Sequence, residues 1–395
     1  MDIHNYQKRF ERTLERINEA DTCQENKDSI FRFKDYLLSE NLSIAKIDRY
    51  LYDLMRYCDM LSKLIEAADK QDLRKVVGII NQKIWTEETK KCFKVMLKRY
   101  YRFVAGIEEK GVYPEIINWV NTNIAESKRK LPEELLNESE IKNIIQKCTC
   151  IRDRALISVL AESGCRIGEI GTLKIKNMSF EQYGTRLTVN GKTGMRKILV
   201  INSTPYLQEW INHHPDNENP EAYMWVRADG NTLCYARISH ILKRSAQKAG
   251  IKKRVYPHLL RHSRATHLAS IMREASMKQY FGWTQSSRMA GVYIHMSGKD
   301  TDNAILQASG IKIEEKEIAR DMQPKICIRC SSTNPVTNVV CGTCGLPLDK
   351  KQAEEIITNQ TKKENIDSFM NKIVENPEFL KVLVKKMAEV NKIQK

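Results

Sequence analysis

The sequence predicts a mainly α-helical protein with a small β-sheet (α+β), divided into more than one domain. Its 395 residues exceed what one hydrophobic core usually organises. Apolar residues recur at helical spacings of three and four through most of the chain, and one short stretch alternates as paired strands do. With 42% hydrophobic and 29% charged residues, the composition excludes wholesale disorder.

The charge favours a polyanionic partner. The chain carries 65 Lys and Arg against 49 Asp and Glu, a net charge of +16. Nucleic acid is favoured over an anionic membrane, although basic proteins also occur for solubility alone. No apolar run reaches the length of about 18 to 20 residues that crosses a bilayer, and no signal peptide opens the chain. We therefore expect a cytoplasmic protein without a membrane partner.

The first 108 residues are predicted to be helical. Residues 1–27 form an N-terminal helical extension, and residues 28–108 form a domain of amphipathic helices. One of these helices starts behind Ser43, with Ile47, Leu51 and Leu54 on its apolar side. Another follows Thr86.

The helix after Thr86 carries a run of cations that we expect to contact DNA phosphates. Its candidate DNA-binding residues are Lys94, Lys98, Arg99 and Arg102. A solvated face is the ordinary explanation of such a run, but charges of one sign beside aromatic residues favour phosphate contacts.

Residues 109–132 are predicted to be a linker that ends in the basic stretch Lys128-Arg129-Lys130-Leu131-Pro132. A second unit of mixed structure follows over residues 133–313. We expect helices over Glu138–Gln146 and Arg152–Glu162, and then two strands, Arg186–Asn190 and Lys197–Ile201, around the turn Gly191-Lys192-Thr193-Gly194. Helical patterns resume at Ala236.

Four short motifs follow one another in this second unit. They are Gly164-Cys165-Arg166-Ile167-Gly168-Glu169, Gly191-Lys192-Thr193-Gly194, His258-Leu259-Leu260-Arg261-His262, and Phe281-Gly282-Trp283 with Tyr293-Ile294-His295. Each motif is weak alone. In this order they resemble the tyrosine recombinase (phage integrase) family, over roughly residues 131–311 and more weakly over the helical N-terminal unit. Trp283 in place of a second histidine is similar to the archaeal branch of that family.

The resemblance implies a catalytic set of Arg166, Lys192, His258, Arg261, Trp283 and the nucleophile Tyr293. Cleaving a phosphodiester without a metal requires a nucleophile, fixed positive charge on the nonbridging oxygens and an acid for the leaving 5′-oxygen. Arg166 and Arg261 can each present two N–H donors to a phosphate. Lys192, at a glycine-flanked hairpin tip, would protonate the leaving oxygen.

The remaining residues of the motifs are given supporting roles. His258 is expected to bond the phosphate and to exchange a proton with Tyr293, and Trp283 to donate its indole N–H and pack the site. Glu169 lies on the same helix face as Arg166 and would orient it or pair with a basic neighbour. His262 and His295 are predicted to be structural. Taken singly, each residue also fits an ordinary surface or core role, and the joint order favours the functional interpretation.

Two C-x-x-C pairs stand near the C-terminus. Cys327, Cys330, Cys341 and Cys344 have the spacing of a tetrahedral Zn²⁺ site and resemble a zinc ribbon over residues 322–348. The alternative is a pair of disulfides or redox dithiols, which a reducing cytoplasm disfavours. Four thiolates leave no open coordination position, so we expect structural zinc and no cofactor for catalysis. Residues 349–395 form a basic helical tail that could be a DNA-binding arm, a protein-contact helix or a solvated segment.

The sequence therefore predicts a site-specific recombinase that cleaves and rejoins duplex DNA through a 3′-phosphotyrosyl intermediate, for integration or excision of a mobile element or virus. The resemblance implies a helical core-binding domain in residues 28–108, a homotetramer on synapsed DNA sites, and docking of residues 301–313 on a neighbouring protomer. Two alternatives are a type IB topoisomerase, which shares comparable chemistry, and a non-catalytic zinc-ribbon regulator, which would leave the Arg, His and Tyr motifs unexplained.

Overall fold

The computed structural model describes residues 2–61, 63–123, 135–191, 193–297 and 322–349, and five single residues beyond them (309, 354, 358, 368 and 381). The chain divides into two compact units. The first comprises residues 1–134 with 233–238, and the second comprises residues 135–232 with 239–395. Residues 301–313 and the tail lie outside the described residues, apart from these single positions.

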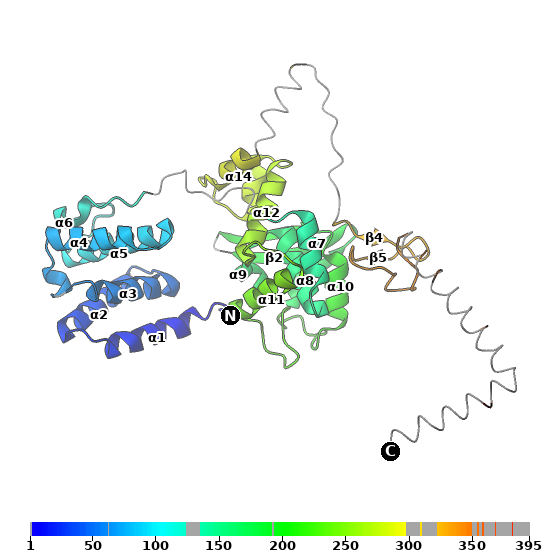
Figure 1. Cartoon of the computed structure of the whole chain (residues 1–395), viewed down its shortest axis with the longest axis horizontal. Coiled ribbons are helices and arrows are strands. Elements are labelled where there is room, and N and C mark those ends of the chain that lie inside the picture. Colours follow the sequence, from blue (N-terminus) through cyan, green and yellow to red (C-terminus); the bar gives the residue numbers. More distant parts are fainter. Residues whose placement is uncertain are drawn as a thin grey trace. The chain divides into compact units, whose positions relative to one another are not determined.

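The first unit is a helical bundle. Its helices are α1 (Tyr6–Glu19), α2 (Gln24–Ser39), α3 (Ile44–Cys58), α4 (Lys70–Gln82), α5 (Glu87–Val104) and α6 (Glu115–Asn118). Helix α3 packs against α1, α2 and α5 (Figure 1). The core is rich in aromatic rings, and Phe33, Tyr57 and Tyr100 are fully buried in it. Because such rings bury large apolar areas, they supply much of the stability of so small a bundle.

The second unit joins helices to a small sheet. Its helices are α7 (Glu138–Gln146), α8 (Ile151–Ser163), α9 (Ile167–Gly171), α10 (Thr204–Asn212), α11 (Tyr235–Lys248, of which the first four residues count with the first unit), α12 (Pro257–Ala269), α13 (Glu274–Phe281) and α14 (Met289–Ser297). Helix α8 is buried on nearly all sides. It packs against α7, α10 and α12 and is the centre of the unit.

The sheet of this unit has three antiparallel strands in the order β1 (Met178–Glu181), β2 (Gly184–Gly191) and β3 (Gly194–Val200). The hairpin predicted from the sequence is β2 and β3, paired up to Gly191 opposite Gly194. Strand β1 was not predicted, because three of its four residues are exposed and no alternation marks it. A second, two-stranded sheet, β4 (Lys325–Ile326) and β5 (Thr333–Asn334), lies in the cysteine-rich segment.

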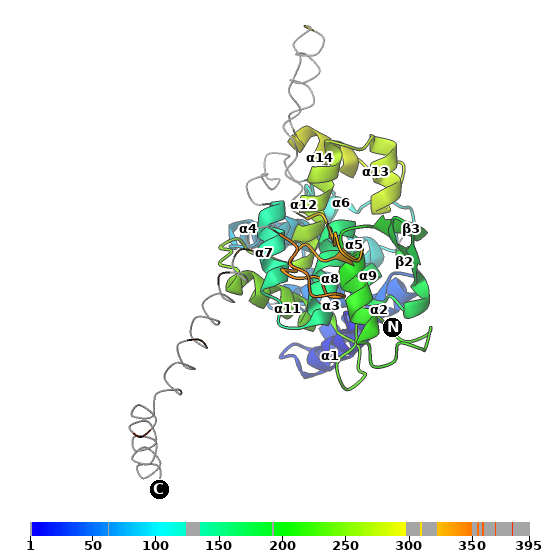
Figure 2. The ribbon, with the colours of Figure 1, turned by 90° about the vertical axis from the view of Figure 1, so that its right-hand side faces the viewer.

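Helices α12, α13 and α14 pack together (Figure 2). Met277 and Phe281 of α13 and Ala265 of α12 form a buried cluster that includes Tyr293 of α14. The predicted fold class, mainly α with a small β-sheet, is confirmed. Among the described helices, none has the length and apolar character needed to span a bilayer.

Candidate active site

Arg166 stands at a tight turn between α8 and α9. Helix α8 ends at Ser163 and is capped by Gly164, whose φ of 57° is left-handed. A Cβ at Gly164 would lie 2.7 Å from the Phe281 ring, so glycine satisfies both the backbone conformation and the space. The turn brings Arg166 to the N-cap of α9 with 34% of its side chain exposed.

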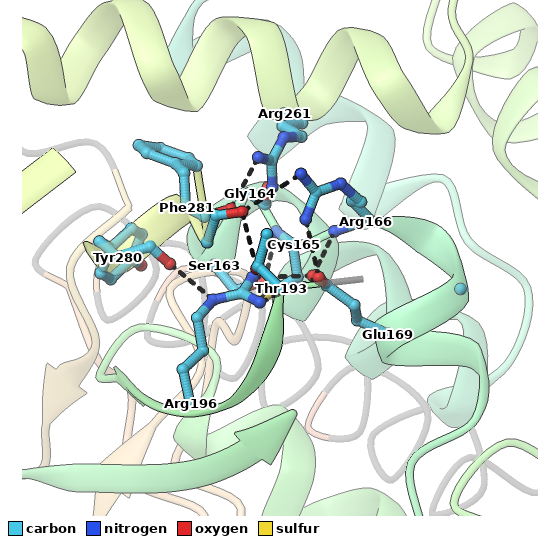
Figure 3. A network of polar contacts seen from close by, with 12 residues as sticks. Ser163, Gly164, Cys165, Arg166, Glu169, Thr193, Arg196, Arg261, Tyr280 and Phe281 are labelled. Atoms are coloured by element: carbon cyan, nitrogen blue, oxygen red, sulfur yellow. Dashed lines mark hydrogen bonds and ion pairs between the residues drawn. The ribbon is translucent and has the colours of Figure 1, made fainter. Parts of the chain in front are cut away.

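Glu169 holds two arginines from a buried position (Figure 3). Its carboxylate accepts hydrogen bonds from Arg166 Nη1 at 3.0 Å and from both terminal nitrogens of Arg196 at 2.8 and 2.9 Å. Burial alone would raise the pKa of Glu169, but the hydrogen bonds and charge of Arg196, followed by those of Arg166, lower it overall. Glu169 is therefore ionised at neutral pH and fixes the position of the Arg166 guanidinium.

The C-terminal carbonyls of α13 bind three arginines. Arg196 Nε donates to Tyr280 O at 2.9 Å, Arg261 Nη2 to Phe281 O at 2.8 Å, and Arg166 Nη2 to Gly282 O at 3.3 Å. The last carbonyls of a helix have no partner within it and carry its negative dipole end. One helix end thus gathers three cations that would otherwise repel one another.

Arg261 is the most buried of these arginines. It is 3% exposed and also donates to Gly164 O at 2.9 Å. Its guanidinium lies 5.5 Å from the centre of the Trp283 ring. Burial and then the charge of Arg166 lower the pKa of Arg261 to about 10, so it remains charged at neutral pH. Its carbonyl contacts use two of five N–H donors and leave the others for a ligand.

The candidate nucleophile Tyr293 lies between a histidine and a tryptophan. Its hydroxyl is 2.6 Å from Nδ1 of His262, and its ring stacks on Trp283 at 5.5 Å between centroids with an interplanar angle of 5°. Tyr293 is 3% exposed. Burial raises its pKa to about 12, so the phenol is neutral at physiological pH and needs a proton acceptor before it can attack.

The structure puts His262, which the sequence suggested was structural, against Tyr293. His258, the residue expected to exchange a proton with Tyr293, lies one turn earlier on α12, with its ring 4.7 Å from that of His262. Desolvation, and then the charges of Arg261 and Arg166, lower the pKa of His258. The spacing of four residues signals that the two histidines share a helix face. It does not reveal which one reaches the tyrosine.

Lys192 lies outside the described residues, but both of its neighbours contact this cluster. A Cβ at Gly191 would come within 2.1 Å of Glu169 Oε1. Thr193 Oγ1 donates to Gly282 O at 3.0 Å. Arg196 of β3, which the motifs do not include, pairs with Glu169 from the same hairpin.

The predicted DNA-binding residues of α5 are largely engaged within the first unit. Arg99 and Arg102 both pair with Glu40, and Arg102 is 5% exposed. Lys98 donates to Val120 O at 3.2 Å and lies 4.3 Å from the Tyr113 ring centre. These contacts leave Arg102 little surface for DNA, and the phosphate contacts expected of Lys94, Lys98, Arg99 and Arg102 stay a prediction. Lys94 is half-buried and has no ion pair within the described ranges.

The four predicted metal-ligating cysteines lie together. The sulfur atoms of Cys327, Cys330, Cys341 and Cys344 are all within 4.8 Å of one another, and two pairs are 3.6 Å apart. A tetrahedral site with metal–sulfur bonds of about 2.3 Å has sulfur–sulfur edges of about 3.8 Å. In both knuckles the residue after the second cysteine, Ser331 or Gly345, is left-handed, with φ of 56° and 73°. The cluster thus has the dimensions to hold a metal ion.

The sequence of the chain is similar to those of known proteins. Residues 134–299 match the family model described as the phage integrase family. Tyrosine recombinase XerA of Pyrococcus furiosus is 28% identical over 285 residues, which cover 70% of this chain and 92% of that relative.

Solved structures agree in fold. The XerH site-specific recombinase bound to palindromic difH substrate has a TM-score of 0.55 at 18% identity, over 78% of this chain and 97% of that one. The lambda integrase tetramer bound to a Holliday junction has a TM-score of 0.53 at 14% identity, over 67% and 76%. These findings favour neither a type IB topoisomerase nor a non-catalytic regulator. Residues 134–299 form a phage integrase domain, and the similarity to curated tyrosine recombinases supports a site-specific recombinase of the tyrosine type.

Proposed function

We propose that this recombinase cleaves and rejoins duplex DNA at a specific site through a 3′-phosphotyrosyl intermediate, with Tyr293 as the nucleophile. The observation that carries the proposal is the 2.6 Å contact between the Tyr293 hydroxyl and His262 Nδ1. It gives a phenol with a raised pKa a proton acceptor within direct reach.

In the proposed step, Tyr293 Oη bonds to the phosphorus as the bond from phosphorus to the 5′-oxygen breaks. The phenolic proton passes to His262 Nδ1, in the tautomer that carries its hydrogen on Nε2. Lys192 protonates the leaving 5′-oxygen. Rejoining is the reverse, with another strand's 5′-hydroxyl as the attacking group, and needs no added energy source because the phosphodiester count is unchanged.

Four further residues would stabilise the charge that develops on the phosphate. Arg166 and Arg261 offer N–H pairs to the nonbridging oxygens, and their positions depend on Glu169 and on the α13 carbonyls. His258 adds a neutral hydrogen-bond donor. Trp283 packs the site, and its indole N–H is a further donor to the phosphate.

Access to DNA requires movement of α14. Tyr293 is nearly inaccessible, so its hydroxyl reaches a phosphate only after α14 shifts away from α12. We infer that binding of the DNA site drives this shift, because the phosphate would take over the contacts of Arg261 and the histidines.

The wider assembly extends the same proposal. Duplex DNA is the partner, held by the core-binding domain 28–108 and the catalytic domain 133–313 with the linker 109–132 between them. Recombination takes place in a homotetramer, in line with the lambda integrase tetramer on a Holliday junction. The biological role is integration or excision of a mobile element.

The four cysteines would hold a structural Zn²⁺. The sulfur spacing and the two left-handed knuckle residues fit tetrahedral coordination. A bound metal would supply folding free energy to the ribbon, 322–348, whose two-residue strands bury little apolar surface.

The test compares covalent adduct formation by the Tyr293→Phe variant and by the control variant Tyr280→Phe. Each change removes one phenolic oxygen from the same unit, and Tyr280 already donates to a backbone carbonyl, Glu162 O, at 3.3 Å. On a nicked substrate that traps the intermediate, wild type and Tyr280→Phe should form a denaturation-resistant adduct and Tyr293→Phe should form none. An adduct with Tyr293→Phe would overturn the assignment.

A further inference from the structure

A hollow of about 320 Å³ lies in the first unit, between α1 and α3. Four of the residues that line it are arginines: Arg9, Arg12 and Arg16 from α1, and Arg49 from α3. Asp48 and the half-exposed ring of Tyr52 complete the α3 side. None of these side chains belongs to the candidate active site or to the cysteine cluster.

The sequence of α1 explains why its arginines share one side. Positions 9, 12 and 16 are spaced by three and four and form one stripe of the helix. The buried residues Phe10, Thr13 and Ile17 form the neighbouring stripe, which packs on α3. The arginine stripe therefore borders the α1–α3 contact and opens onto the hollow. Glu11, Glu15 and Glu19, spaced by four, form a third stripe and pair with none of these arginines in the described part of the chain.

Two carboxylates neutralise only part of this charge. Asp48 is 3% exposed, accepts the Thr13 hydroxyl at 2.6 Å and pairs with Arg9 at 3.2 Å. Asp53 pairs with Arg49 Nε at 2.6 Å. Asp53 also pairs with Arg56 at 3.6 Å, so the two carboxylates do not balance the four arginines of the hollow. Among the described residues, Arg12 and Arg16 have no ion-pair partner.

The Arg49 guanidinium is also incompletely satisfied within the protein. Arg49 Nη2 is shielded from solvent and has no hydrogen-bond partner within the described residues. A buried N–H group without a partner costs free energy. The guanidinium groups of Arg9, Arg12 and Arg16, together with the Arg49 side chain, give the hollow several N–H donors and an excess of positive charge, a combination that suits an oxyanion with several oxygens.

We propose that the arginine hollow of α1 and α3 binds a backbone phosphate of duplex DNA. The proposal rests on the proposed function, which makes DNA the polyanion that this protein meets. It gives the N-terminal helix α1 a role of its own: α1 completes a phosphate site that α3 alone, with Arg49 already paired to Asp53, does not form. The contact is to phosphate and not to bases, so it is independent of sequence.

The test is binding of the full chain to a cognate and an unrelated duplex over a range of salt concentrations. Arg12→Ala with Arg16→Ala should weaken binding to both duplexes by about tenfold near 0.1 M salt and reduce the slope of log affinity against log salt by up to about two. The charge-retaining pair Arg12→Lys with Arg16→Lys should lose less. Because neither arginine pairs within the described part of the unit, the unfolding temperature should be unchanged.

The matched control is Arg74→Ala with Lys75→Ala on α4, which removes the same charge from exposed positions of the same unit. It should leave the salt slope near that of wild type. Unchanged binding by the Arg12 and Arg16 double variant, or an equal loss in the α4 control, would overturn the proposal. Adduct formation by wild type on the nicked substrate reports the proposed function separately, so failure of one claim is distinguishable from failure of the other.

Discussion

At the scale of single residues, Glu169 determines where two arginines lie, and its charge is needed for both. We expect Glu169→Gln to lower the free energy of unfolding by about 3 kcal/mol at pH 7, because it leaves the buried Arg196 without a counter-charge. The folded-state pKa of Glu169 lies below its ordinary 4.5, so this stabilisation is complete above pH 4.5 and is lost as the pH falls through the lowered value.

Chemical denaturation of wild type and Glu169→Gln across this pH range measures the effect. The difference between the two should be constant from pH 7 to about 5 and narrow at lower pH. Glu221→Gln is the control, since that exposed carboxylate pairs only with the surface lysines Lys174 and Lys176 in the described ranges. A difference that widened on acidification would show that Glu169 is protonated in the folded protein.

A second prediction at the scale of residues concerns His262. His262→Asn retains a side-chain oxygen that can accept the Tyr293 hydroxyl but cannot take its proton, so cleavage at pH 7 should fall by about 10² to 10⁴. The residual rate should rise with pH, because the phenol then ionises directly as the pH approaches its pKa of about 12. Single-turnover cleavage from pH 6 to 10 checks this. If His258→Asn produced the rising profile and His262→Asn did not, the proton would pass to His258.

At the scale of elements, the β2–β3 hairpin positions its tip against Glu169. Gly191→Ala would place a Cβ within 2.1 Å of Glu169 Oε1 and displace the carboxylate from the arginines. Cleavage should fall by more than tenfold, because the arginines that would contact the scissile phosphate are displaced. DNA affinity should be retained, because cations elsewhere in the protein are not disturbed. Gly291→Ala, in α14 with open space around it, is the control. An equal loss of cleavage in both variants would contradict this prediction.

The ribbon is a second element with its own prediction. Cys327→Ser with Cys330→Ser should remove bound zinc and unfold residues 322–348. Cleavage of a short nicked substrate should persist, because four thiolates leave the metal no open position for chemistry. The zinc content of the variant tests the loss of metal, and its adduct yield tests the retention of cleavage. Loss of the adduct in a protein whose catalytic domain remained folded would assign the metal a part in cleavage.

The local pattern was sufficient for elements whose own residues define them. The capping box of Asn137 and Glu140 starts α7 at the predicted Glu138, and Thr86 caps α5 through the Thr89 amide as expected. Partners distant in sequence were not predictable. Arg99 and Arg102 meet Glu40 about sixty residues earlier, so the cationic run of α5 gave no sign that it was already paired.

At the scale of the whole molecule, recombination and cleavage should respond differently to inactive protomers. If four tyrosines must act in one complex, an equal mixture of wild type and Tyr293→Phe should retain about one-sixteenth of the recombination. Adduct formation on a nicked half-site needs one active protomer and should retain about half. Both yields are measured by titrating the variant at constant total protein. Equal declines would argue against a four-protomer complex.

Contacts between distant segments also limited how much of the candidate site could be predicted. Motif order predicted Arg166, Arg261, Trp283 and Tyr293 as one set. The structure brings these residues together from the N-cap of α9, from α12, from the segment after α13 and from α14. His262 and the role of the α13 carbonyls were missed, because both depend on how helices far apart in sequence pack. The arginines around the α1–α3 hollow were missed for the same reason.

The concealment of Tyr293 has a consequence for the cell that carries this protein. An enzyme able to cut chromosomes would be dangerous if its attacking oxygen were displayed while it diffused along arbitrary DNA. Here the Tyr293 hydroxyl contacts His262 and the Tyr293 ring is covered by Trp283. If Tyr293 is the nucleophile, we expect the free protein to bind arbitrary DNA without cleaving it. The contacts that hold α14 in place would then also protect DNA outside the recombination site.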